Sequence, residues 1–140
     1  MRKIIFASHH KLAEGLRDTF DYITNNVVEV KTINAYISNN PVEEEIVATL
    51  KDLDLQKDEV LVFTDMQGGS VNQAFVKYLQ YPHFHLIAGV NLPLILELLI
   101  NLPENYIDSN QITAAIDNAK KQIIYVNDVM NNLQIDEDDE

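Results

Sequence analysis

The feature that most constrains the fold is a regular alternation of short apolar runs with segments of helical periodicity. Four runs have the length and composition of strands, and a helical pattern follows each of them: 3–7, 27–33, 59–64 and 84–89. Such alternation is typical of an α/β protein, a doubly wound, mostly parallel sheet with helices on both faces. A fifth run, QIIYV at 122–126, comes after the last helical pattern and predicts a final strand.

The strand order decides which residues meet at the edge of this sheet. Right-handed crossovers leave a few orders, of which we expect 2-1-3-4. Sites in doubly wound sheets form beyond the carboxyl ends of strands where the order reverses, here between the first and third strands. The residues just past these two ends are Ser8, His9, Thr64 and Asp65. Because neighbouring strands lie about 4.8 Å apart, this topology brings an imidazole and a carboxylate together.

Length and composition indicate a single globular domain. The chain has 140 residues, enough for one core, and 46% of them are apolar. We place the domain at residues 1–130. Five of the last six residues are acidic, so we expect 131–140 to form a solvated, disordered tail, with a partner-binding tail as the alternative.

Charge and cysteine content exclude several classes of function. A formal net charge of −12 argues against nucleic acid and anionic membrane surfaces as partners. The absence of cysteine excludes disulfides, thiolate nucleophiles and Cys-ligated zinc, and it fits a cytoplasmic protein. The longest apolar stretch, LPLILELLI, is too short to span a membrane, and the N-terminus lacks the pattern of a signal peptide.

The residues at the expected reversal suit chemistry on an anionic group. A carboxylate such as Asp65 can fix the tautomer of His9 and leave its other ring nitrogen as a nucleophile or base. In the following loop, Gly68 and Gly69 allow close backbone approach, Ser70 adds a hydroxyl, and amides at the next helix start attract anions. The alternative is that His9 only caps a turn and that the glycines only shape one.

We expect no ligand role for the remaining histidines and no metal site. His83 and His85 flank Phe84 at the amino end of a strand, so we expect exposed strand residues rather than ligands. Asp65 and the histidines do not make a standard metal-ligand set. We therefore expect neither a metal nor another cofactor.

Three motifs resemble those of the mannose-family enzyme IIA proteins of the bacterial phosphoenolpyruvate:sugar phosphotransferase system. IIFASHHKLAEGL at 4–16 is similar to their first strand followed by Ser/Thr-His-Gly. VLVFTDMQGGSVNQA at 60–74 resembles their Asp-x-x-Gly-Gly-Ser motif, and AGVNLPLILELL at 88–99 resembles their Gly-Val-Asn-Leu/Ile-Pro motif. The likeness runs in order over residues 3–126, nearly the whole domain.

The resemblance implies a role for each site residue. His9 takes the position of the family's phosphorylated histidine, Asp65 that of its partner aspartate, and Ser70 lies at the phosphoryl pocket with Gly68 and Gly69. Such domains accept a phosphoryl group from the carrier protein HPr and pass it to a histidine of the cognate IIB component. Sugar is phosphorylated later, during uptake through membrane IIC and IID subunits, so nothing in this chain need touch it.

The resemblance also implies an assembly. Proteins of this family are cytoplasmic homodimers in which the last strand pairs antiparallel with the partner's sheet. The run at 122–126 fits that swapped strand.

Two positions depart from the family pattern. His10 stands where the family usually has glycine; its side chain can donate to the phosphoryl group or sit at the rim, and we favour the rim because a side chain replacing glycine usually points outward. Val71 stands where the family usually has proline, with little expected effect.

Three other functions remain open at this point. A dihydroxyacetone-kinase phosphotransfer subunit begins similarly but usually lacks the Asp-x-x-Gly-Gly-Ser form. A regulatory IIA-like domain would use its phosphorylation state to control binding to another protein. A flavodoxin-like nucleotide binder would need a phosphate loop after the first strand, which this chain lacks.

Overall fold

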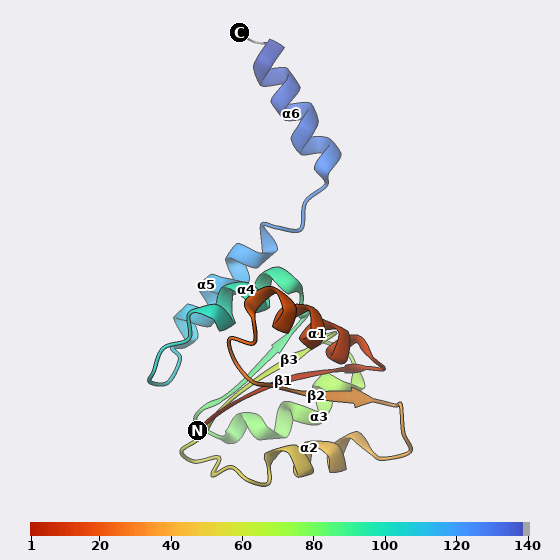
Figure 1. Ribbon diagram of the computed structural model, residues 1–140, viewed down its shortest axis with the longest axis vertical. Coiled ribbons are helices and arrows are strands. Elements are labelled where there is room, and N and C mark those ends of the chain that lie inside the picture. Colours follow the sequence, from red (N-terminus) through yellow and green to blue (C-terminus); the bar gives the residue numbers. More distant parts are fainter. Residues whose placement is uncertain (139–140) are drawn as a thin grey trace.

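A parallel sheet of four strands forms the centre of the molecule (Figure 1). The computed structural model describes residues 1–138, and side chains up to Leu133. The strands, in the order β2-β1-β3-β4, are β1 (Arg2–His9), β2 (Val30–Ala35), β3 (Glu59–Thr64) and β4 (Phe84–Ala88). The order predicted from the sequence is confirmed, with β2 at one edge.

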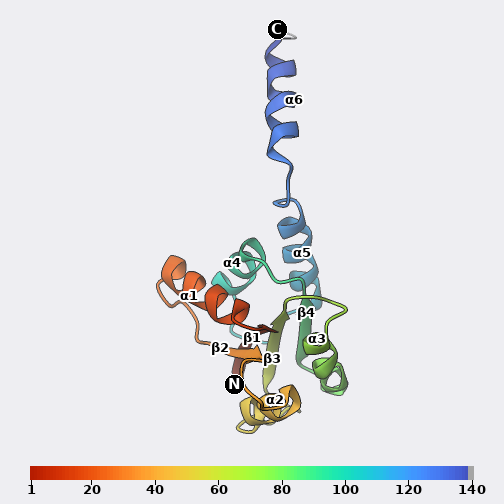
Figure 2. The ribbon, with the colours of Figure 1, turned by 90° about the vertical axis from the view of Figure 1, so that its right-hand side faces the viewer.

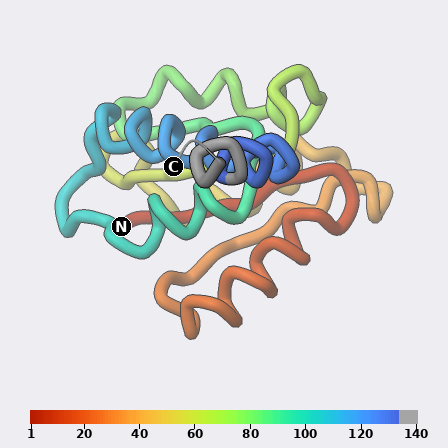
Figure 3. Tube along the Cα trace, turned by 90° about the horizontal axis from the view of Figure 1, so that it is seen from above, coloured from red at the N-terminus to blue at the C-terminus, as the bar shows by residue number. Residues whose placement is uncertain are grey.

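Helices cover both faces of this sheet, as expected for a doubly wound fold. On one face lie α1 (Leu12–Thr24), α4 (Leu92–Ile100) and α5 (Ser109–Lys120). On the other lie α2 (Val42–Leu50) and α3 (Ser70–Phe75), which continues as the 3₁₀ helix η1 (Val76–Gln80). Two views show that α4 lies between α1 and α5 (Figures 2 and 3).

The two apolar layers meet at the central strands. Because side chains alternate along a strand, Ile4 and Phe6 of β1 pack against the layer of α1, α4 and α5, whereas Ile5 and Ala7 pack against the layer of α2 and α3. Every residue of β3 is buried. Burial on both faces explains why these strands are continuous apolar runs in the sequence.

The register of the central strands positions the candidate site. Ala7 of β1 lies opposite Thr64, the last residue of β3. The residues that follow each of them, Ser8 and His9 on one side and Asp65 on the other, therefore leave the sheet at the same edge. This is the reversal point predicted from the strand order.

The second strand begins three residues later than predicted. The sequence predicts a strand over 27–33, but β2 starts at Val30. Asn25 and Asn26 both adopt the left-handed backbone conformation, with φ of 55° and 59°, and the N–H of Asn26 donates to Asp21 at the end of α1. The chain therefore completes the turn that ends α1 before it extends into β2.

The predicted final strand is wrong for the single chain. Residues 123–125 have no regular secondary structure, and the last helix, α6 (Val126–Asp138), begins directly after them. A strand needs a neighbour for its hydrogen bonds, and this segment, whose side chains are exposed, pairs with no strand in the described part of the chain. Pairing with a partner subunit remains a prediction.

The C-terminal helix stands apart from the body. Figures 1 and 2 both show α6 extending away from the layers that contain the other helices. It crosses the boundary that we place after residue 130, and residues 139–140 of the predicted tail lie outside the described part. The division into 1–130 and a tail therefore remains a prediction.

No helix within residues 1–138 combines the length and the apolar character needed to cross a membrane.

Candidate active site

The sheet brings His9 and Asp65 into direct contact. Nδ1 of His9 lies 2.8 Å from Oδ2 of Asp65, and the backbone N–H of His9 donates to the same oxygen over 2.8 Å. The other carboxylate oxygen accepts the N–H of Met66 over 3.0 Å. One carboxylate thus holds both the ring and the backbone of His9.

The electrostatics of Asp65 fix the tautomer of His9. Burial by itself raises the pKa of Asp65, whose side chain is 8% exposed, but the hydrogen bonds from the backbone and ring of His9 outweigh burial and hold this pKa below its usual value. An ionised carboxylate only accepts hydrogen bonds, so Nδ1 of His9 must donate. In the neutral ring Nε2 then keeps its lone pair, and the side chain, 36% exposed, is accessible to a reactant.

The glycine loop lies against the ring of His9. A Cβ at Gly69 would stand 3.1 Å from Cε1 of His9, so only glycine leaves the ring its full space. A Cβ at Gly68 would meet nothing within 4 Å. The N–H of Gly69 donates to the carbonyl of Met66 over 3.3 Å, so it is used inside the loop.

A buried asparagine that the sequence analysis missed anchors this loop. The side chain of Asn72 accepts a hydrogen bond from Thr64 over 2.8 Å and donates to the carbonyl of Gln67 over 3.1 Å. It therefore ties the loop to the end of β3. The feature that could have revealed this role is the position of a polar residue on the buried side of α3, next to Val71.

Ser8 shapes the turn before α1. Its buried hydroxyl oxygen accepts the N–H of Ala13 over 2.7 Å. A Ser hydroxyl commonly satisfies a free N–H at a helix start in this way. The capping role that the sequence left open for His9 thus belongs to Ser8, and the ring of His9 contacts Asp65 instead.

His10 occupies a position that favours glycine. Its φ is 55°, in the left-handed region, and its N–H donates to the carbonyl of Ala35 over 2.8 Å. This conformation suits the glycine that the resemblance implies at this position. The side chain is exposed, and its ring makes no hydrogen bond within the described part of the chain.

Tyr36, directly after β2, is a second residue that the sequence analysis missed. Its ring centroid lies 5.4 Å from that of His9, with 37° between the planes, and its hydroxyl is hydrogen-bonded to Oγ of Ser70 over 2.5 Å. Its φ of 68° is unusual for a bulky side chain and costs about 1–3 kcal/mol. The signal was weak, because the sequence does not show where a side chain after an edge strand points.

The remaining two histidines lie away from this site, but they are half-buried rather than exposed. The ring of His83 stacks on Tyr106, 3.5 Å between centroids, which covers it. Burial on β4 lowers the pKa of His85. Neither residue contacts the His9 site.

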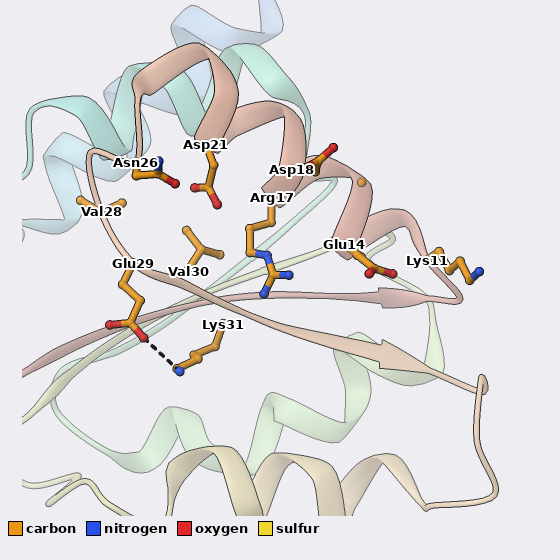
Figure 4. Close-up of a pocket in the computed structure, with 11 residues that line it drawn as sticks. Lys11, Glu14, Arg17, Asp18, Asp21, Asn26, Val28, Glu29, Val30 and Lys31 are labelled. Carbon is orange, nitrogen blue, oxygen red and sulfur yellow. Dashed lines mark ion pairs between the residues drawn. The ribbon is translucent and has the colours of Figure 1, made fainter.

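A separate groove runs between α1 and β2 (Figure 4). Charged side chains of both signs line it, and Glu29 pairs with Lys31 over 3.0 Å. Arg17 reaches across from α1 to the hydroxyl of Thr32. The groove includes neither His9 nor Asp65.

This fold recurs in known proteins. The model of the EIIA-man family, described as the fructose IIA component of the phosphotransferase system (PTS), matches residues 3–120. The chain belongs to the EIIA-man family. It is therefore related to the IIA components of mannose-type sugar phosphotransferase systems, which are phosphotransferase components. A comparison with curated proteins found no match.

Solved structures agree with this membership. A protein from Klebsiella pneumoniae subsp. pneumoniae, described as a phosphoenolpyruvate-dependent sugar PTS permease, is 39% identical, with a TM-score of 0.83 over 92% of this chain and 93% of that one. A PTS IIA protein associated with the fucose utilization operon of Streptococcus pneumoniae is 27% identical, with a TM-score of 0.74 over 92% and 96%. The mannose/sorbose-specific IIA subunit from Enterococcus faecalis shares the fold, with a TM-score of 0.75 over 89% and 93% at 20% identity.

EIIA-man membership favours a IIA component of the phosphotransferase system among the functions that the sequence left open. It does not favour a dihydroxyacetone-kinase subunit or a flavodoxin-like nucleotide binder. It agrees with the three motifs on which the resemblance was based.

Proposed function

We propose that this protein is a cytoplasmic phosphocarrier that accepts a phosphoryl group from phospho-HPr on His9 and passes it to a IIB component. The observation that carries the proposal is the contact between Nδ1 of His9 and Asp65. It leaves Nε2 as an accessible nucleophile at the reversal point of the sheet. Membership of the EIIA-man family supports the choice of phosphoryl donor and acceptor.

The transfer step balances without a base or a metal ion. A P–N bond in the protonated phosphohistidine of HPr breaks as a P–Nε2 bond to His9 forms. The hydrogen on Nδ1 of His9 stays in place, so the donor ring becomes neutral and the His9 ring becomes positive. That charge develops against the carboxylate of Asp65, which stabilises it. Transfer to the IIB histidine repeats this exchange, with His9 as the donor.

The phosphoryl oxygens need donors of their own. Ser70, which follows the glycine that lies against the ring of His9, supplies a hydroxyl, and the backbone at Gly68 and Ser70 supplies amides at the start of α3. The N–H of Gly69 is engaged with Met66, so its contribution is the space that it leaves for the ring. We place the exposed His10 at the rim of this pocket.

The assembly that we propose is a homodimer. Residues 122–126 pair with the partner's sheet, and the dimer also covers an apolar stripe on α6. This stripe consists of exposed residues spaced like one helix face: Val129, Met130 and Leu133. Exposed apolar side chains arranged along one face mark an interaction site. Membrane IIC and IID subunits complete the system but act after IIB.

The experiment that tests this function is stepwise transfer with purified components. Phosphoenolpyruvate, enzyme I and HPr should label the wild-type protein, and addition of the IIB component encoded beside it should remove that label. His9→Ala should take up none. A wild-type protein that HPr cannot label, or one that keeps its label in the presence of IIB, would contradict the proposed function.

A further inference from the structure

The backbone at Tyr36 is held in a conformation that its side chain disfavours. A bulky residue at a φ of 68° is a conformational outlier, and such outliers persist only where the surroundings fix them. The neighbouring strand end helps to fix this one, because the carbonyl of Ala35 accepts the N–H of His10 over 2.8 Å. The result is a tyrosine whose ring lies against His9, although 56% of the residue remains exposed.

The side chain of Tyr36 joins the two groups on which phosphoryl transfer depends. Its ring lies against the ring of His9, with centroids 5.4 Å apart, and its hydroxyl bonds Oγ of Ser70. Within residues 1–138, no hydrogen bond joins Ser70 directly to His9. Tyr36 is thus the link between the nucleophile and the serine of the glycine loop.

The hydrogen-bonding capacity of the two hydroxyls gives this link a direction. A serine hydroxyl has one hydrogen and two acceptor lone pairs. Either hydroxyl could donate in this bond; because a phenol is a better donor than an aliphatic hydroxyl, we assign the donor to Tyr36 and the acceptor to Ser70. The hydrogen of Ser70 is then free, and acceptance of one bond strengthens a hydroxyl as a donor of the next.

We propose that Tyr36 is a positioning residue for phosphoryl transfer, whose hydroxyl turns the hydrogen of Ser70 toward the phosphoryl group on His9. The inference rests on the proposed function of His9 and adds a residue to it. Tyr36 acts through Ser70 and not on the phosphoryl group. Its effect on transfer therefore exists only while the serine hydroxyl is present.

A double-mutant cycle tests this dependence. Tyr36→Phe keeps the ring and loses the hydroxyl, and Ser70→Ala removes the group through which Tyr36 acts. We expect each single variant to accept phosphoryl about tenfold more slowly in single turnover, below the loss seen for a principal transition-state donor. The double variant should be no slower than Ser70→Ala alone. Tyr22→Phe, at a tyrosine of α1 that is 88% exposed, should react at the wild-type rate.

Two phosphoryl donors separate this inference from the proposed function. Phospho-HPr tests transfer from the partner protein, whereas phosphoramidate is a small donor that releases ammonia and needs no docking. If only phosphoramidate labels His9, the proposed donor is wrong, and the cycle measured with phosphoramidate decides the role of Tyr36.

Three results would overturn the inference. Additive losses in the double variant would mean that Tyr36 acts independently of Ser70. A wild-type rate for Tyr36→Phe would mean that the hydroxyl does nothing in transfer. A His9 that neither donor labels would leave no phosphoryl group to position. Equal melting temperatures of the four proteins would show that the fold is unchanged across the cycle.

Discussion

One oxygen of Asp65 holds both the ring and the backbone of His9, although 56 positions separate the two residues in the sequence. The adjacent ends of β1 and β3 create this arrangement, because their register places both residues at one edge of the sheet. A histidine fixed at Nδ1 and at its own N–H has little freedom to turn. Its second nitrogen is therefore presented in one direction.

Loss of the charge on Asp65 should slow transfer without unfolding the protein. Asp65→Asn keeps the size of the side chain, but it removes the anion against which positive charge develops, and its amide nitrogen can face the ring and favour the wrong tautomer. We expect phosphotransfer to His9 to be at least ~10²-fold slower. Rapid-quench transfer from phospho-HPr measures this rate. Asp18→Asn, at an exposed position of α1, should behave as the wild type, and a near-normal rate for Asp65→Asn would show that Asp65 only ends its strand.

The two glycines of the loop should respond differently to alanine. At Gly69 the new Cβ would lie 3.1 Å from Cε1 of His9 and would push the ring from its position. Small displacements of a reacting group are costly, so we expect transfer to slow about tenfold. At Gly68 a Cβ meets open space, and Gly68→Ala should have little effect. Equal rates for the two variants, measured in the same quench experiment, would mean that the contact does not control the ring.

The half-buried histidine of β4 should make stability depend on pH. Burial lowers the pKa of His85; His83 lowers it further, and Glu59 acts in the opposite direction. The unfolded chain therefore binds a proton at His85 more readily than the folded one, and stability falls as the pH drops through and below 6.5, the ordinary histidine value.

Thermal melting at about pH 7.5 and about pH 5.5 measures this effect on either side of the ordinary value. The melting temperature of His85→Gln should fall less between the two conditions than that of the wild type. The aspartates with lowered pKa values, Asp52, Asp58 and Asp65, lose their contributions only at lower pH, below their ordinary 3.8. An unchanged pH dependence in His85→Gln would contradict the assignment.

The C-terminal region should control the assembly state. Deletion of residues 122–140 removes both the predicted partner strand and the apolar stripe of α6, and it should give monomers or aggregates. Removal of 134–140 alone should leave the dimer intact, because the exposed apolar residues up to Leu133 remain. Sedimentation of the three chains measures this directly. A full-length protein that sediments as a monomer at micromolar concentration would refute the dimer.

Much of the fold could be predicted because each central strand carries its own signal. Burial of β1 and β3 on both faces produces continuous apolar runs, and right-handed crossovers leave few orders for the strands. The contact between His9 and Asp65 follows from this topology alone. The start of β2 was misplaced because residues 27–29, whose composition suits a strand, follow the left-handed turn at Asn25 and Asn26 and precede the first pair with β1, which is at Val30.

The parts that could not be predicted depend on side-chain direction or on a second chain. Nothing in the local sequence shows that Tyr36 turns back over His9, because a φ of 68° is fixed by the tertiary surroundings. The link from Asn72 to Thr64 and Gln67 joins residues whose proximity depends on the path of the loop. Residues 122–126 have the composition of a strand, but a strand forms only beside a neighbour.

The measurement that tests the account most directly is identification of the phosphorylated atom after reaction with phosphoenolpyruvate, enzyme I and HPr. Peptide mapping by mass spectrometry locates the residue, and NMR of the ring nitrogens distinguishes Nδ1 from Nε2. We predict phosphorylation of Nε2 of His9 in the wild type and in His10→Gly, which also relieves a left-handed backbone position, and none in His9→Ala. Label that persists in His9→Ala and disappears in His10→Gly, or a phosphoryl group on Nδ1, would contradict the site described for this protein.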